Sequence, residues 1–154
     1  MQIPIGPCPS VEESKNSQLF TFAGVKGEGI CTYIYDIDSF NITMMLFDTP
    51  LTLKTRLMGV DGVELRNTNL KEKTLAYKGK SRLGELILDK TINVELHGGD
   101  KYGRELVKVT LGDGQDLANV LISEKLVAKY DGGTKQNWAD FMETWWPDIQ
   151  PYDN

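Results

Sequence analysis

Three short segments combine acidic and basic side chains at spacings that could act on a phosphate group. They are residues 36–39 (Asp-Ile-Asp-Ser), 56–64 (Arg-Leu-Met-Gly-Val-Asp-Gly-Val-Glu) and 100–104 (Asp-Lys-Tyr-Gly-Arg). Taken alone, they can be explained as a polar turn, a structural salt bridge of Arg56 and a charged hairpin turn. Together they supply what phosphodiester hydrolysis requires: guanidinium groups and a bound cation to offset charge on the phosphate, and a carboxylate to activate water.

The acidic residues of these segments predict an oxygen-lined cation site. Asp36 and Asp38 close a predicted strand and could offer an oxygen ligand to a hard cation. Asp61 and Glu64 follow the end of another strand, so one carboxylate could bind a metal ion while the other acts as a base. Arg56 interrupts an apolar strand. Because a buried unpaired charge is costly, we expect Arg56 to meet a carboxylate or a phosphate.

The elements that must position these residues are mainly strands. Alternating β-branched and aromatic residues predict strands at residues 30–35, 40–47, 51–60, 92–96 and 106–111, with turns at 48–50 and 112–114. Helical spacing of apolar residues predicts helices at residues 69–88, 116–128 and 137–146. This order is typical of a five-stranded Greek-key barrel capped by helices. We therefore expect a β-rich α+β protein with an OB-fold and about three helices.

The outer parts of the chain are expected to be irregular. Prolines and glycines predict an N-terminal arm over residues 1–29, with a short strand at residues 19–22. The barrel domain is expected over residues 30–146, followed by a C-terminal tail over residues 147–154. We interpret His97 as a turn residue, and the three tryptophans near the C-terminus as helix packing.

Composition limits the possible partners. The 154 residues carry a net charge of −5, so a nucleic acid would be bound locally rather than across the whole surface. No apolar run approaches the about 20 residues that a membrane span needs, and the N-terminus shows no secretory pattern. Cys8 and Cys31 are too few for a disulfide scaffold and are expected to be thiols. We therefore expect an intracellular protein, cytoplasmic or nuclear, with no membrane partner.

Over about residues 33–138 the chain resembles the staphylococcal nuclease-like (thermonuclease) family. Residues 36–39 match a family stretch similar to Asp-Gly-Asp-Thr, and residues 56–64 match Arg-Leu-x-Gly-Ile-Asp-x-Pro-Glu. Residues 100–104 are identical to the family's Asp-Lys-Tyr-Gly-Arg segment. The stretch at residues 129–135 is more similar to intracellular and viral members than to the secreted bacterial type. The resemblance implies an OB-fold nuclease.

The resemblance also implies a calcium-dependent reaction and roles for individual residues. The calcium ligands would be Asp38, Asp61 and the backbone carbonyl of Gly62, the general base would be Glu64, and the phosphate clamp would be Arg56 and Arg104. The nucleotide-binding residues would be Lys101, Tyr102 and Tyr130. Family members hydrolyse DNA and RNA at the bond between phosphorus and the 5′ oxygen and leave 3′-phosphates.

Two segments depart from the family pattern. Ile37 replaces the glycine between the two acids, so we expect the metal loop to shift. Gly62 and Val63 replace a Thr-Pro or Ala-Pro pair, which removes the φ restriction of proline beside the implied base. The alternative hypothesis is an OB-fold nucleic-acid-binding module with weakened catalysis. The retention of both arginines and the glutamate favours the enzyme, and we expect a monomer.

Overall fold

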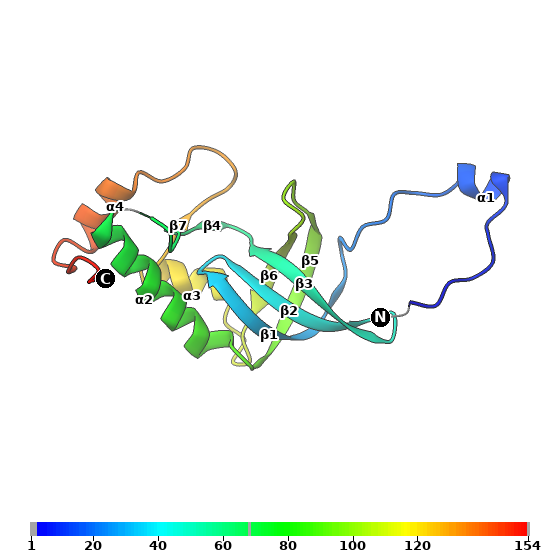
Figure 1. Cartoon of the computed structure of the whole chain (residues 1–154), viewed down its shortest axis with the longest axis horizontal. Helices are drawn as coiled ribbons and strands as arrows, with labels where there is room; N and C mark the ends of the chain where they lie inside the picture. Colours follow the sequence, from blue (N-terminus) through cyan, green and yellow to red (C-terminus); the bar gives the residue numbers. More distant parts are fainter. Residues whose placement is uncertain (1–2, 68, 154) are drawn as a thin grey trace.

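A closed barrel of five strands forms the centre of the protein, in a computed structural model that describes residues 3–67 and 69–153. The strands are β1 (Lys26–Asp36), β2 (Ser39–Leu46), β3 (Thr49–Leu57), β5 (Thr91–Gly99) and β6 (Glu105–Thr110). Their order around the barrel is β1-β2-β3-β6-β5, and neighbours are antiparallel except for the parallel pair β3 and β6. The predicted five-stranded OB-type barrel is therefore confirmed (Figure 1).

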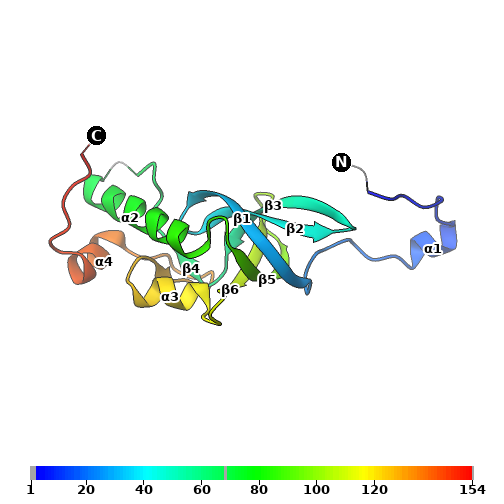
Figure 2. The ribbon, with the colours of Figure 1, turned by 90° about the horizontal axis from the view of Figure 1, so that it is seen from below.

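Two short strands and three helices lie at one end of the barrel, and the N-terminal arm leaves the opposite end (Figures 1 and 2). The short strands β4 (Val60–Asp61) and β7 (Ala128–Lys129) pair antiparallel. The helices are α2 (Leu70–Ile87), α3 (Leu117–Ser123) and α4 (Trp138–Trp145). Each helix follows an Asn or Asp whose side chain accepts a hydrogen bond from the amide three residues later, which caps the helix. Among the described residues, no helix is long and apolar enough to cross a membrane.

The strand boundaries differ from the prediction at several places. The strand expected over residues 51–60 ends at Leu57, with Val60–Asp61 forming the separate strand β4, and β5 continues to Gly99 rather than ending at residue 96. β1 begins at Lys26 rather than Ile30, because residues 26–30 already pair with β5. The turn between β2 and β3 is Phe47-Asp48 rather than residues 48–50, and both turn residues have positive φ, at 54° and 57°. Pro50 is already paired with β2.

The N-terminal arm contains a short helix that was not predicted, in addition to the three expected helices. Helix α1 (Val11–Lys15) begins with a capping box, in which Ser10 and Glu13 each bind the other's backbone amide. The expected strand at residues 19–22 does not form.

Two further predictions near the barrel are wrong. Helix α3 ends at Ser123 and not at residue 128, because Lys125 adopts a left-handed φ of 59° that a right-handed helix cannot contain. His97 lies within β5 rather than in a turn, with its Nε2 atom 3.1 Å from Glu95 Oε1.

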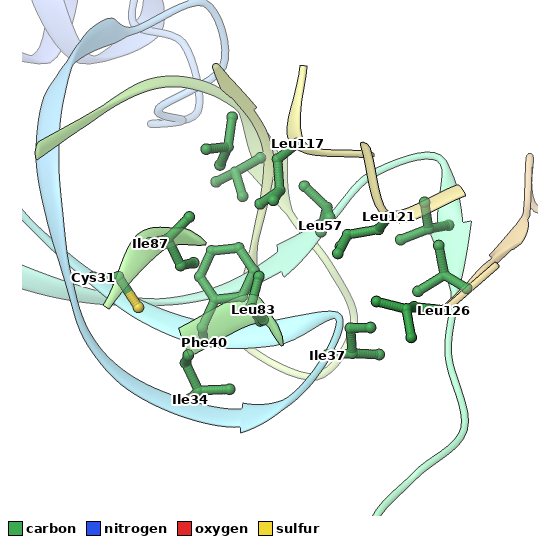
Figure 3. Packing of buried hydrophobic residues seen from close by; sticks show 14 of the residues in the cluster. Cys31, Ile34, Ile37, Phe40, Leu57, Leu83, Ile87, Leu117, Leu121 and Leu126 are labelled. Carbon is green, nitrogen blue, oxygen red and sulfur yellow. The ribbon is translucent and has the colours of Figure 1, made fainter. Parts of the chain in front are cut away.

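One cluster of buried hydrophobic side chains joins the barrel to the helices (Figure 3). Its fully buried members include Phe40, Leu57, Leu83, Ile87 and Leu121. Cys31 also belongs to it, and burial raises the pKa of this thiol to about 11. Cys8 is exposed, and both cysteines are free thiols as expected.

The residues after α4 pack against α2. The Tyr152 ring stacks on Tyr77 with the centroids 4.6 Å apart, and its amide donates to the Leu70 carbonyl at 2.9 Å. The Thr74 hydroxyl donates to the Gln150 carbonyl at 2.7 Å. The C-terminal segment therefore adds to the helical end of the barrel.

Two of the three tryptophans pack as expected. Trp138 lies edge-to-face against Phe141, and Trp146 Nε1 donates a hydrogen bond to the Lys125 carbonyl at 2.6 Å. Trp145 differs, since 48% of it is exposed. Phe141 and Met142 belong to the buried hydrophobic cluster, and Trp138 and Trp146 pack against it, which holds α4 to the rest of the protein.

Candidate active site

The turn between β1 and β2 holds a buried carboxylate. Asp38 is 9% exposed, and its backbone carbonyl accepts a hydrogen bond from the Leu57 amide at 2.9 Å. Its side chain accepts bonds from the Ser39 hydroxyl at 3.2 Å and from the Gly62 amide at 3.3 Å. Asp36 accepts a bond from the Leu65 amide at 3.0 Å. These bonds tie the turn to the end of β3 and to the loop after β4, which brings the first two predicted segments together.

Arg56 of β3 lies between two buried carboxylates. Its guanidinium nitrogens are 3.2 Å from Asp38 Oδ2 and 3.6 Å from Asp61 Oδ1, and one of them donates to the Leu57 carbonyl at 3.0 Å. The three charged side chains are only 14%, 13% and 9% exposed. Arg56 therefore meets carboxylates, as expected for a charged residue in an apolar strand.

The site is short of positive charge even with Arg56 in place. Burial raises the pKa of Asp38 above the ordinary carboxyl value, and the negative charges of Asp61 and Asp36 raise it further. Arg56 and the Ser39 hydroxyl act in the opposite direction without cancelling the effect of burial. An additional cation bound here would relieve this repulsion.

The donor atoms of this cluster suit a hard cation. Asp38 and Asp61 offer carboxylate oxygens, and Gly62 follows Asp61 with a backbone carbonyl. In residues 3–67 and 69–153, no group of three or more Asp, Glu, His or Cys side chains is arranged to hold a metal ion. A calcium ion would therefore take its other ligands from backbone oxygens and water, as calcium sites commonly do. The oxygen donors of this cluster are of the kind that hard cations prefer.

Glu64 extends into solvent beside the buried carboxylates. Its side chain is 59% exposed, and its Oε2 atom pairs with Arg66 Nε at 2.9 Å. It lines a groove of 500 Å³ together with Asp61 and Gly62. A carboxylate in this position is accessible to water, which a general base requires.

Arg104 reaches the same turn from the loop between β5 and β6. One of its guanidinium nitrogens donates to the Ser39 hydroxyl at 3.0 Å, and its Nε donates to Asp100 Oδ2 at 2.9 Å. Asp100 Oδ1 also accepts bonds from the amides of Tyr102 and Arg104, at 2.8 and 2.9 Å. Burial raises the pKa of Asp100, but these bonds and the charge of Arg104 outweigh it and lower the pKa overall. The third segment thus joins the first through Ser39.

Of the nucleotide-binding candidates, Lys101 and Tyr102 lie beside Arg104, whereas Tyr130 lies elsewhere, after β7. Tyr102 is exposed beside Arg104, whose guanidinium carbon is 5.5 Å from the ring centroid, and Lys101 Nζ is 5.2 Å from the same centroid. Tyr130 follows β7, where its amide donates to the Gly59 carbonyl at 2.9 Å and Lys135 Nζ lies 6.0 Å from its ring. None of the described hydrogen bonds or ion pairs joins Tyr130 to the carboxylates.

Sequence reasoning missed five of the residues that line the groove beside Glu64. These are Arg66, Asn67, Lys135, Gln136 and Trp138. Arg66 could have been found because it lies two residues after the candidate base. The residues after position 130 carry no such signal, because only the fold brings the segment between β7 and α4 next to the loop after β4. Ser39, which links Asp38 to Arg104, was also not singled out.

Comparison with known families agrees with this geometry. A family model described as staphylococcal nuclease homologue matches residues 54–140, which is more than half of the chain. The match includes the segments at residues 56–64 and 100–104 and begins after Asp38. No curated protein matches the chain. The matched segments and the OB-type barrel agree, and the chain belongs to the staphylococcal nuclease homologue family, which indicates a nuclease-type or nucleic-acid-binding function.

Proposed function

We propose that this protein is a calcium-dependent nuclease that hydrolyses phosphodiester bonds of DNA, RNA or both. The observation that carries the proposal is the convergence of two arginines on one turn. Arg56 contacts Asp38 of this turn, and Arg104 contacts its Ser39. Two guanidinium groups that converge beside carboxylates and an accessible glutamate are what a phosphate in a hydrolytic site requires.

In the proposed reaction, Asp38, Asp61 and the Gly62 carbonyl would hold calcium, which when bound supplies positive charge to the phosphate oxygens. Glu64 accepts a proton from a water molecule, and the water oxygen bonds to phosphorus. The bond between phosphorus and the 5′ oxygen breaks, the 5′ oxygen leaves with the bonding electron pair and takes a proton from solvent water, and the phosphate stays on the 3′ oxygen. Arg56 and Arg104 orient the phosphate and stabilise the negative charge that develops on it.

The fixed position of Arg104 supports this role. Asp100 accepts hydrogen bonds from the Nε atom and from the backbone amide of Arg104. The Arg104 side chain therefore needs little reorganisation when a phosphate binds. The guanidinium carbon also lies over the Tyr102 ring. Tyr102 and Lys101 would contact the nucleotide next to the phosphate, and Tyr130 would stack on a base.

A nucleic-acid-binding module without catalysis is the second candidate. The observation that favours it is that Arg56 already pairs with both carboxylates, at 3.2 and 3.6 Å. A guanidinium group that stays in this position could replace the metal ion as a structural cation. Such a module would bind strands without cutting them.

Plasmid digestion distinguishes the two candidates. With millimolar calcium we expect cleavage of the plasmid, and with a chelator we expect none. Arg104→Ala should reduce the rate by about 100-fold or more, because loss of one transition-state donor typically costs about 3 kcal/mol. Lys15→Ala is a matched control, since Lys15 is exposed on α1 away from the barrel. An intact plasmid with calcium, or equal cleavage with the chelator, contradicts the proposal.

A further inference from the structure

The residues that line the groove beside Glu64 fall into two chemically different sets. The first set is Asp61, Gly62, Val63 and Glu64, and the second set is Arg66, Asn67, Lys135, Gln136 and Trp138. The first set includes the proposed base and two of the three proposed calcium ligands. The second set has two cationic side chains, two amide side chains and an aromatic ring, and the family resemblance assigns no role to any of them.

The two cationic side chains of the second set, Arg66 and Lys135, are accessible to solvent. The Arg66 side chain is 87% exposed, and its partner Glu64 is 59% exposed. An ion pair so exposed contributes little stability and is readily exchanged for another anion. Lys135 is exposed as well, in the segment between β7 and α4. Both side chains can therefore turn toward a ligand in the groove without unfolding any element.

The lining of the groove differs in charge from the rest of the protein. The chain has a net charge of −5, whereas in this lining Arg66 and Lys135 balance the charges of Asp61 and Glu64. Guanidinium and ammonium groups beside an aromatic ring are typical of surfaces that bind single-stranded nucleic acid, where phosphates meet cations and bases meet apolar rings. The partly buried Trp138 ring leans edge-to-face on Phe141, which fixes its orientation.

The groove lies outside the loop that carries Arg104. None of the residues at 100–104 lines it. In Figure 1 the loop between β5 and β6 and the segment between β7 and α4 project separately from the body of the protein. A strand with its phosphate at Arg104 and Glu64 would therefore have a second surface along which to continue.

We propose that this groove binds the single-stranded segment that continues from the phosphate under attack. Arg66 and Lys135 contact backbone phosphates, and Trp138 offers the apolar surface for a base. This inference rests on the proposed function for the direction of the strand, but the binding itself requires no catalysis. Engagement of Arg66 by a phosphate also releases Glu64 from its ion pair, which leaves that carboxylate available to water.

The test measures binding in a chelator, where the proposed metal-dependent reaction does not occur. The probe is a fluorescently labelled single-stranded oligonucleotide of 12 nucleotides, and the readout is anisotropy from low to moderate salt. Arg66→Ala and Lys135→Ala should each weaken binding several-fold and lower the slope of log K against log salt by about 0.7, as expected for one lost phosphate contact on a single strand. Lys15→Ala removes the same charge from α1 and should change neither quantity. Arg66→Lys should keep the slope.

Three outcomes would overturn the inference: no binding by the unmodified protein, equal effects of Lys135→Ala and Lys15→Ala, or tighter binding of a duplex than of the single strand. Melting temperatures of all variants show whether they fold, and the exposure of both residues predicts that they do. The two proposals can fail separately. If only the proposed nuclease function is wrong, the plasmid stays intact with calcium, whereas oligonucleotide binding and its salt dependence are as expected.

Discussion

The side chain of Ile37 occupies the space in which a Cβ atom at Gly62 would lie, since that atom would overlap the Ile37 Cγ2 methyl. Gly79 of α2 has the same relationship to Ile37, because a Cβ there would be 2.5 Å from its Cδ1 atom. Two glycines thus accommodate the isoleucine that stands between two acids. The Gly62 amide still reaches Asp38 at 3.3 Å, so the two proposed ligand segments remain together.

The first prediction is that the effect of Gly79→Ala on the free energy of unfolding changes sign with the residue at position 37. Alanine normally stabilises a helix interior by about 1 kcal/mol relative to glycine. In the unmodified protein the new Cβ meets Ile37, which is 2% exposed and has little room to move, so we expect a loss of about 1 kcal/mol or more from overpacking. Ile37→Val removes the Cδ1 methyl, and in that background Gly79→Ala should be stabilising. Urea melts of the four proteins give the coupling free energy, and additive effects would contradict the proposed packing.

The second prediction concerns Arg56. Arg56→Met keeps the unbranched apolar stem of the side chain but leaves Asp38 and Asp61 buried without their cation. Removing one partner of a buried ion pair typically costs about 3–5 kcal/mol, so the midpoint of urea unfolding should fall sharply at neutral pH. A loss below about 1 kcal/mol would show that solvent or another group already compensates the two carboxylates.

The fold could be predicted largely from local patterns, whereas the site could be predicted only in part. Alternation of apolar residues located all five barrel strands, and the helical spacing of apolar residues located α2 and α4 within a residue. The errors occurred where single residues override a pattern, as with the left-handed Lys125 that ends α3. The contact of Arg104 with Ser39 and the position of Lys135 beside Glu64 depend on barrel closure. Residue spacing along the chain does not indicate such contacts, so the three segments could be linked only by their combined chemistry and by the family resemblance.

The third prediction is a pH-dependent link between α2 and α3. Arg82 Nε donates to Glu124 Oε1 at 2.8 Å and a second guanidinium nitrogen donates to Oε2 at 2.9 Å. These bonds lower the pKa of Glu124, with burial acting in the opposite direction. A carboxyl whose folded pKa is depressed stabilises the protein above its unfolded value of 4.5, and this stabilisation is lost as the pH falls through the folded pKa.

Glu124→Gln should therefore lower the free energy of unfolding by about 0.5–1 kcal/mol at pH 7, a small value because about a third of each side chain is exposed. The difference should disappear when the pH falls well below 4.5. Glu143→Gln removes the same charge from an exposed position of α4 and should stay within about 0.5 kcal/mol of the parent. A penalty for Glu124→Gln that is equal at both pH values would mean that the side chain acts through packing alone.

The fourth prediction is a linkage between calcium and stability. A ligand at 100 times its dissociation constant stabilises the folded state by about 2.7 kcal/mol, which raises the melting temperature of a protein of this size by roughly 5–10 °C. We expect this shift with calcium and a nucleoside bisphosphate together. Asp61→Asn should abolish it, and Lys15→Ala should retain it. An equal shift in the Asp61→Asn protein would place the calcium elsewhere.

The last prediction concerns Glu64 as the base. Glu64→Gln keeps the shape of the side chain and removes the proton acceptor, so single-turnover cleavage should slow by roughly 100- to 10,000-fold. Because the side chain is 59% exposed and its ion pair with Arg66 lies in solvent, the free energy of unfolding should change by less than about 0.5 kcal/mol. Glu143→Gln, which removes an exposed charge on α4, should cleave at the parental rate. Parental cleavage by Glu64→Gln would exclude Glu64 as the base, whereas loss of cleavage that follows loss of folding in a parallel urea melt would make Glu64 a structural residue and favour the binding module.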